Sequence, residues 1–389
     1  MDILVSLPFL ARILLAMALA SAISYASTPF VMKLAVRIGA VDVPRDNRRM
    51  HKVPIPRLGG LAIVIAFLLC TFLFVKLDSQ IQGVLLGAII ILVVGVLDDC
   101  LTLKAMPKFI AQIVAACLVY RSGCEIRYVT NPFSVQPIDL GFFSGFVTVV
   151  WIVMMTNAVN FIDGLDGLAV GVSGISTGTM LVIAMLLGEE SVAVILAALL
   201  GACLGFIPFN FNPARIFMGD TGSTFLGFVL ASMSVQGLFK MYAVISFVVL
   251  FLILGVSFFD ITFAVIRRLA KHQNPMTADR GHIHHRLIDM GLNQKQSVAI
   301  VYMLTGVLGL AAVLLANSTG TKAFILFSAV CVVAIVGFAV IFGPTADPPS
   351  RRIRRKVNKQ KAREQRAFFL TKIGSILRFP LAQWMLYGI

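Results

Sequence analysis

The chain has 389 residues, of which 59% are hydrophobic and 13% are charged, and its formal net charge is +15. Soluble globular domains carry about 25% charged residues. This composition therefore excludes an ordinary soluble enzyme and predicts a protein that lies in a lipid bilayer. The six cysteines form no CxxC pair, so we expect small core residues rather than disulfides or metal ligands.

Apolar stretches of about 20 residues predict helices that cross the membrane. Eleven such stretches follow one another, at residues 3–25, 59–76, 82–98, 106–121, 141–159, 167–187, 190–208, 221–239, 241–266, 297–316 and 322–342. We interpret the first as an uncleaved span, because Asp2 and no lysine or arginine precedes Arg12. The predicted fold class is an all-α polytopic membrane protein with about eleven transmembrane helices.

The basic residues are distributed unevenly between the two sides of the predicted bundle. The loops after spans 1, 3, 5, 7 and 9, together with the C-terminal tail, hold 27 of the 33 lysines and arginines. Since basic loops stay on the cytoplasmic side, we expect the N-terminus outside and the C-terminus inside.

The chain divides into a transmembrane domain, residues 1–343, and a basic cytoplasmic tail, residues 344–389. The tail begins with prolines and a run of basic residues, and Pro380 argues against a twelfth crossing. One hypothesis is a tail bound to anionic lipid at the membrane surface. A dispensable solubilising tail explains the composition equally well.

Polar clusters gather on the predicted cytoplasmic face. The third span ends with Asp98 and Asp99, and Lys104 and Lys108 follow near the start of the fourth. Carboxylates at a helix C-terminus oppose the helix dipole, so this pattern predicts a metal ion or a cationic partner. A polar helix end with snorkelling lysines explains the motif equally well.

Two further acidic motifs lie in loops on the same predicted face. NFIDGLDG places Asn160, Asp163 and Asp166 three residues apart, and GDTGS places Asp220 just before the eighth span. Helix capping explains one such aspartate but not the combined pattern. Crowded carboxylates repel one another, whereas Mg²⁺ takes one or two carboxylates together with substrate phosphates. The pattern indicates metal-assisted phosphoryl transfer at the membrane surface.

The loop after the ninth span is rich in groups that donate hydrogen bonds to phosphate oxygens. These groups are Arg280, His282, His284 and His285. The first loop has a similar composition, with Lys52 and Arg57. A zinc site is not favoured, because there is no HExxH motif and no cysteine pair. A solvated, positively charged loop is the alternative.

Four motifs together resemble one known family. The chain carries DD at 98–99, NxxDGxDG at 160–167, NPARIFMGDTGS at 212–223 and DRGHIHHRL at 279–287. This order resembles that of the polyprenyl-phosphate N-acetylhexosamine-1-phosphate transferases, over roughly residues 1–343. The stretches IPRLGG and HIHHRL are more similar to the bacterial undecaprenyl-phosphate GlcNAc-1-phosphate branch than to the MurNAc-pentapeptide translocases.

The resemblance implies transfer of GlcNAc-1-phosphate from UDP-GlcNAc to undecaprenyl phosphate, with release of UMP. It would be the first membrane step of a cell-envelope polysaccharide, namely O-antigen, common antigen or teichoic acid. The resemblance also implies a bacterial inner-membrane enzyme whose active site faces the cytoplasm, surrounded by membrane lipids, with a homodimer as a common assembly and no nucleic-acid partner. UDP-MurNAc-pentapeptide or another UDP-N-acetylhexosamine is the alternative donor.

Residue roles follow from the resemblance by motif position. The expected catalytic residues are Asp98, Asp99 and Asp163. The expected ligands of Mg²⁺, or alternatively of Mn²⁺, are Asp220 and Asn160. The expected substrate-binding residues are Lys52, Arg57, Lys108, Asp166, Asn210, Phe217, Arg280, His282, His284 and His285. Among these, Asn210 and Phe217 would contact the uridine, and His284 and His285 the sugar phosphate.

The residues do not decide whether the reaction has one step or two, and they leave a prenyltransferase and a transporter as alternative classes of protein. A phosphate monoester has a second pKa near 6, so the acceptor needs no strong base and direct attack is favoured over an aspartyl intermediate on Asp98 or Asp99. A prenyltransferase would lack a nucleotide site. A transporter would carry charged groups near mid-membrane, and Asp260, within or near the end of the ninth span, is the exception to the pattern seen here.

Overall fold

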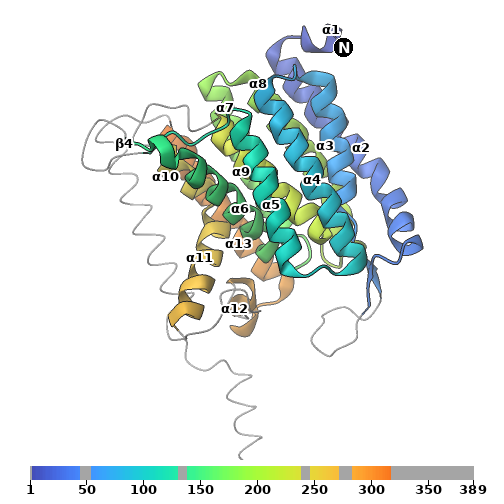
Figure 1. Cartoon of the computed structure of the whole chain (residues 1–389). Helices are drawn as coiled ribbons and strands as arrows, with labels where there is room; N and C mark the ends of the chain where they lie inside the picture. The colour runs from blue at the N-terminus through green and yellow to red at the C-terminus, as the bar shows by residue number, and fades with distance from the viewer. Residues whose placement is uncertain (1, 44–53, 130–137, 238–245, 271–282, 317–389) are drawn as a thin grey trace, which may run out of the picture.

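The computed structural model describes residues 2–43, 54–129, 138–237, 246–270 and 283–316. In these residues the chain forms a helical bundle with two small antiparallel sheets (Figure 1). The helices are α1 Asp2–Val5, α2 Phe9–Arg37, α3 Gly60–Phe74, α4 Ser79–Leu101, α5 Ala105–Arg121, η1 Gly141–Phe143, α6 Ser144–Ile162, α7 Leu168–Leu187, α8 Glu190–Asn210, α9 Gly219–Gly237, α10 Ser246–Ile253, α11 Gly255–Ala270, α12 Ile283–Asp289 and α13 Gln294–Ala316. The paired strands are β1 Val41–Asp42 with β2 Ile55–Pro56, and β3 Tyr128–Val129 with β4 Ile138–Asp139.

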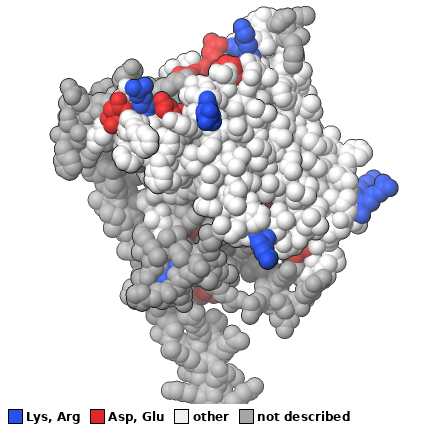
Figure 2. All heavy atoms as spheres, viewed as in Figure 1, with Lys and Arg blue, Asp and Glu red and all other residues white. Residues whose placement is uncertain are grey.

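Six of the described helices are long and apolar enough to cross a membrane, by length and composition: α2, α4, α6 with η1, α7, α8 and α13. On the face drawn in Figure 2, charged side chains gather toward the ends of the bundle and leave its middle nearly free of charge. The all-α polytopic class is therefore confirmed. The eleventh predicted span, 322–342, and the tail, 344–389, lie outside the described residues, so the count of eleven stays a prediction.

The first predicted span, 3–25, is wrong in its boundaries, because α2 begins at Phe9 and continues to Arg37. Past Tyr25, Thr28, Val31 and Ala35 are buried and continue the packed face of the helix. The hydroxyl of Thr28 donates to the carbonyl oxygen of Ser24 at 2.7 Å. Its polar group is thus satisfied inside the helix and does not end it.

The ninth predicted span, 241–266, is interrupted between α10 and α11, at Leu254. The Ser176 hydroxyl of α7 donates to the backbone oxygen of Ile253 at 2.8 Å. A side chain that pairs with a freed backbone group makes such a break tolerable inside an apolar bundle. The sequence analysis missed the break, although Gly255 and Ser257 directly follow it, because the segment contains no proline and is apolar on both sides of Leu254.

Helix α9 lies at the centre of the bundle and determines where the polar residues meet. Every residue from Thr221 to Gly237 is buried, and α9 packs against α3, α4, α6, α7 and α8. Small residues allow this close approach: a Cβ at Gly95 of α4 would lie 2.6 Å from the Cα of Thr221. The N-terminus of α9 is thereby held against the C-terminal end of α4.

Candidate active site

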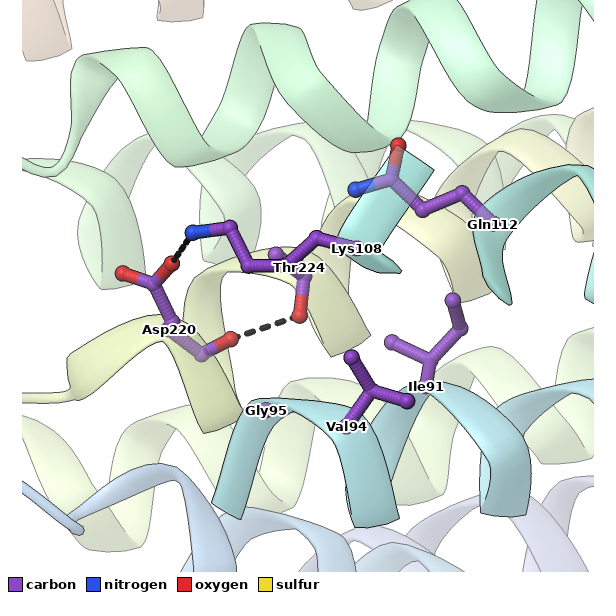
Figure 3. Close-up of a pocket in the computed structure, with 7 residues that line it drawn as sticks. All are labelled: Ile91, Val94, Gly95, Lys108, Gln112, Asp220 and Thr224. Atoms are coloured by element: carbon purple, nitrogen blue, oxygen red, sulfur yellow. Dashed lines mark hydrogen bonds and ion pairs between the residues drawn. The ribbon is translucent and has the colours of Figure 1, made fainter. Parts of the chain in front are cut away.

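Three helix ends bring two carboxylates and one ammonium group together. Asp98 lies in the last turn of α4, Lys108 in the first turn of α5 and Asp220 in the first turn of α9. The Lys108 Nζ donates to Asp98 Oδ2 at 3.0 Å and to Asp220 Oδ2 at 2.6 Å. Figure 3 shows the Lys108–Asp220 contact at the edge of a small pocket. The pocket is lined by Ile91, Val94, Gly95, Lys108, Gln112, Asp220 and Thr224.

Asp99 is buried and pairs with the start of α9. Its Oδ1 accepts from the backbone N–H of Asp220 at 3.0 Å, and its Oδ2 accepts from the N–H of Thr221 at 3.0 Å and from the Thr221 hydroxyl at 2.6 Å. Arg57 adds a bond from Nε to Oδ1 at 3.2 Å. The first N–H groups of a helix lack partners within it and carry a partial positive charge. Asp99 satisfies them from a neighbouring helix.

These contacts explain why α4 tolerates two aspartates at its C-terminus. Asp98 receives the Lys108 ammonium and the backbone N–H of Leu103, the latter at 2.7 Å. Asp99 receives Arg57 and the positive end of α9. The sequence predicted a metal ion or a cationic partner here, and the structure provides cationic partners for both carboxylates.

Gly219 makes the junction between α9 and the first loop sterically feasible. Its φ is +72°, and a Cβ at this position would collide with the backbone oxygen of Arg57 and the carboxylate of Asp99. A glycine is therefore required on both conformational and steric grounds. Three backbone hydrogen bonds join the same segments: from Gly59 N to Phe217 O at 2.9 Å, from Gly60 N to Met218 O at 2.8 Å and from Phe217 N to Pro56 O at 2.8 Å.

Asn160 and Asp163, at the end of α6, complete this acidic cluster. Asn160 donates to the Ser223 hydroxyl of α9 at 2.8 Å and lies beside the Asp220 carboxylate. Burial, followed by the charges of Asp220, Asp99 and Asp166, raises the pKa of Asp163 to about 8. Like charges and desolvation both disfavour an ionised carboxylate. The cluster therefore holds more negative charge than its surroundings stabilise.

Asp166 and Asn210 organise the neighbouring loop that leads into α9. Asp166 Oδ2 accepts from Asn212 Nδ2 at 2.8 Å and from the backbone N–H of Ala214 at 3.1 Å. The Asn210 side chain accepts from Gly167 N at 3.1 Å and donates to Ile216 O at 2.9 Å. Both side chains thus connect the loop after α6 to the loop after α8.

Proteins with closely similar sequences identify the family. A probable undecaprenyl-phosphate N-acetylglucosaminyl 1-phosphate transferase from Bacillus subtilis is 39% identical over 79% of this chain and 87% of its own length. The chain belongs to the polyprenyl-phosphate N-acetylhexosamine-1-phosphate transferase family. The model of glycosyl transferase family 4 matches residues 81–238. A decaprenyl-phosphate N-acetylglucosaminephosphotransferase from Mycobacterium leprae is 32% identical over 83% of this chain and 88% of its own length.

A more distant member of the family, an undecaprenyl-phosphate alpha-N-acetylglucosaminyl 1-phosphate transferase from Yersinia pestis, is 29% identical over 72% of this chain and 78% of its own length. The matched family segment, 81–238, runs from α4 to the end of α9 and so contains all four carboxylates of the acidic cluster.

The predicted phosphate-binding residues are placed only in part. Arg57 lies against Asp99. His284 and His285 both belong to α12, and His285 is half-buried. Lys52, Arg280 and His282 lie outside the described residues. Their predicted role in binding substrate stays a prediction of the family resemblance.

A divalent metal ion fits the chemistry of the acidic cluster. In the described part of the chain, no three acidic, histidine or cysteine side chains are placed to hold a metal ion together. Mg²⁺ does not need three, because it usually keeps waters and takes one or two carboxylates with substrate phosphates. Burial and, after it, the neighbouring carboxylates raise the pKa of Asp163, and a bound cation would offset the repulsion among these carboxylates.

Sequence reasoning missed several polar residues of the site. Thr221 bonds to Asp99 through both its backbone and its hydroxyl. Gln112 of α5 accepts at 2.6 Å from the Asn157 amide of α6, about one turn along each helix from the acidic cluster. An amide inside an apolar span is a usable signal, since polar groups there are costly and need partners.

Proposed function

We propose that the protein transfers GlcNAc-1-phosphate from UDP-GlcNAc to undecaprenyl phosphate, giving undecaprenyl-diphosphate-GlcNAc and UMP. The observation that carries this proposal is the cluster of Asp98, Lys108, Asp163 and Asp220 at one end of a bundle of membrane-length helices. It occurs in a chain that is 39% identical to a relative named for this reaction. A site at a helix end lets a lipid acceptor keep its chain in hydrocarbon while its phosphate meets a soluble nucleotide sugar.

The reaction needs one displacement at phosphorus. An oxygen of the acceptor phosphate forms a bond to the phosphorus that carries the sugar, and the bond from that phosphorus to the bridging oxygen breaks. UMP leaves with the electron pair. Because the acceptor is mostly a dianion at neutral pH, no strong general base is required. The remaining difficulty is the repulsion between two anionic substrates.

Direct attack is favoured over a covalent aspartyl intermediate. A nucleophilic carboxylate needs a free and accessible lone pair. Asp98 and Asp99 are only 5% and 4% exposed. Both oxygens of Asp99 accept hydrogen bonds, and Asp98 accepts from Leu103 and Lys108. Their engagement supports roles in holding Lys108 and α9 rather than in forming a bond to phosphorus.

The chain supplies positive charge and ligand oxygens to this reaction. Asp220 and Asp163, with the amide oxygen of Asn160, would hold Mg²⁺, and Mn²⁺ is the alternative. When bound, the ion supplies neutralisation of the phosphate charges. The Nζ of Lys108 lies 2.6 Å from Asp220 and would donate to a phosphate oxygen at the same site. Such fixed donors stabilise the charge that spreads over the transferred phosphoryl group.

The orientation and cellular context form part of the same proposal. The excess of basic residues in alternate loops supports a site that faces the cytoplasm of a bacterial inner membrane. The product would begin a cell-envelope polysaccharide, and a homodimer is the expected assembly. UDP-MurNAc-pentapeptide ranks second as donor, since the relatives compared above are named for N-acetylglucosamine. Family membership argues against a transporter.

Radiolabelled UDP-GlcNAc tests the proposal directly. Membranes that contain the protein are incubated with undecaprenyl phosphate and the labelled donor, with and without EDTA, beside a parallel reaction with UDP-MurNAc-pentapeptide. We expect lipid-linked label from UDP-GlcNAc alone, and its loss with EDTA or in Asp220→Ala. Lipid-linked label from UDP-MurNAc-pentapeptide, and none from UDP-GlcNAc, would refute the proposal that UDP-GlcNAc is the donor. Equal label in the presence of EDTA would refute the role of a divalent metal.

A further inference from the structure

A buried carboxylate lies in α11, outside the acidic cluster. Asp260 is 3% exposed within a segment that the sequence predicts to span the membrane. A carboxylate in such surroundings is costly unless hydrogen bonds compensate it. Its Oδ1 accepts a hydrogen bond from the backbone N–H of Ile283 at 2.8 Å, across 23 residues of sequence. Asp260 therefore binds the main chain at the start of another helix.

That helix is α12, and it needs external support. It has only seven residues, and helices of this length are not stable alone in water. Its first N–H groups lack partners within the helix, so a carboxylate at this end both pairs with one of them and complements the helix dipole. Ile283 and Leu287, four residues apart, are buried on one face. Asp260 fixes the helix start, and these apolar contacts fix its face.

Helix α12 carries the histidine pair and is connected, through the start of α13, to the loops that hold Asp166 and Asn212. His284 and His285 directly follow the residue that Asp260 holds. A short turn leads from α12 to α13. There Gln294 accepts at 2.8 Å from the side chain of Asn212, which also donates to Asp166 at 2.8 Å. Figure 1 shows α12 beside the lower ends of α11 and α13.

We propose that Asp260 is a positioning residue for α12, which sets the place of His284 and His285 without itself touching a substrate. The inference rests on the proposed function, because the histidines are taken as donors to the phosphates of UDP-GlcNAc. Loss of the contact between Asp260 and Ile283 should therefore impair binding of the nucleotide sugar more than binding of the lipid acceptor. The contact to the backbone of Ile283 needs an acceptor oxygen and not a negative charge.

Two substitutions of Asp260 separate the need for an acceptor oxygen from the need for a negative charge. Asp260→Asn keeps an acceptor oxygen in nearly the same shape, whereas Asp260→Leu removes it. Ile283→Pro removes the N–H from the other side, and proline is favoured at the first position of a helix. The control is Asp289→Leu, because Asp289 is exposed at the end of α12. All variants are made in the full-length protein, purified in detergent and compared for thermal unfolding.

Hydrogen–deuterium exchange gives a readout that does not depend on activity. We expect exchange in the peptide that contains α12 to increase in Asp260→Leu and Ile283→Pro, and to stay at the wild-type level in Asp260→Asn and Asp289→Leu. We also expect the KM for UDP-GlcNAc to rise about tenfold in Asp260→Leu and in Ile283→Pro, which is the size expected for the loss of one buried hydrogen bond. The KM for undecaprenyl phosphate should change less than about threefold.

Three results would overturn the proposal. They are unchanged exchange in α12 of Asp260→Leu, an Asp260→Asn variant as impaired as Asp260→Leu, or parallel rises in both KM values. If Asp260→Leu does not fold, Ile283→Pro and Asp260→Asn still decide between these outcomes. If the wild-type protein transfers no GlcNAc-1-phosphate, the proposed function fails, while the exchange measurement still tests whether Asp260 holds α12.

Discussion

Replacing Asp99 by asparagine separates a structural role for this residue from a chemical one. Every group around its carboxylate is a donor: two backbone N–H groups, the Thr221 hydroxyl and the Arg57 guanidinium. An asparagine amide brings two N–H groups of its own, so one backbone N–H at the start of α9 loses its acceptor. An unpaired buried N–H costs about 1–3 kcal/mol. Removing one partner of a buried ion pair costs about 3–5 kcal/mol. We take this figure as the upper limit for the loss in free energy of unfolding of Asp99→Asn.

The expected result is a fall of roughly 5 °C in the unfolding temperature of Asp99→Asn, for a chain of this length. The buried thiols of Cys70, Cys124 and Cys203 allow unfolding to be followed with a thiol-reactive dye. Asp98→Asn is the matched control. It keeps an acceptor for Leu103, and Lys108 retains Asp220, so we expect a shift below about 2 °C. An Asp99→Asn protein that is inactive but as stable as wild type would refute this reasoning.

Three further changes test the acidic cluster. Lys108→Met leaves two neighbouring carboxylates without their shared cation, so transfer should fall at least about 100-fold, whereas Lys104→Met, at an exposed position, should change it less than about threefold. Because the pKa of Asp163 is raised to about 8, its proton must leave before the carboxylate binds a cation. The Mg²⁺ concentration needed for half-maximal transfer should therefore rise as the pH falls below about 8, and this dependence should be lost in Asp163→Asn. Gly95→Ala places a Cβ 2.6 Å from the α9 backbone and should destabilise the protein by about 1–3 kcal/mol. In the control, Gly178→Ala, the new Cβ meets only an ordinary contact at 3.8 Å. The free energy of unfolding of this control should differ from that of the wild type by less than about 1 kcal/mol in the same thiol assay.

The sequence predicted the class of the fold and the grouping of the acidic motifs for physical reasons. Eight of the predicted spans each overlap one described α-helix, whereas the first and the ninth differ in boundaries or continuity. The agreement follows because a long apolar segment in a bilayer must satisfy its backbone groups internally, as a helix does. Two aspartates against the helix dipole required cationic partners, and Arg57 and Lys108 are among those found. The pairing of Asp99 with the start of α9 could not be predicted, since Asp99 and Asp220 are 121 residues apart. No local sequence pattern indicates which helix start will contact which helix end.

The helix break at Leu254 and the length of α2 were missed for a different reason. In both cases a contact from another helix decides the local conformation. Ser176 stabilises the break by pairing with the backbone oxygen of Ile253. Past Tyr25, the buried residues Thr28, Val31 and Ala35 continue the face of α2 that packs in the bundle. Local propensity is a weak predictor where packing supplies the stabilisation.

The charges of the acidic cluster support the proposal that it is a site rather than a rigid structural network. Asp98, Asp99, Asp163 and Asp220 face two cations, Arg57 and Lys108. With all four carboxylates ionised, two negative charges stay unmatched in a mostly buried environment. A network built only for stability would pair them, because an unmatched buried charge costs several kcal/mol. At Asp163, at the end of α6, burial and then the neighbouring negative charges raise the pKa to about 8, which favours the protonated carboxyl group near neutral pH. A divalent cation matches the excess, and it would also bring the positive charge that two phosphate-bearing substrates require.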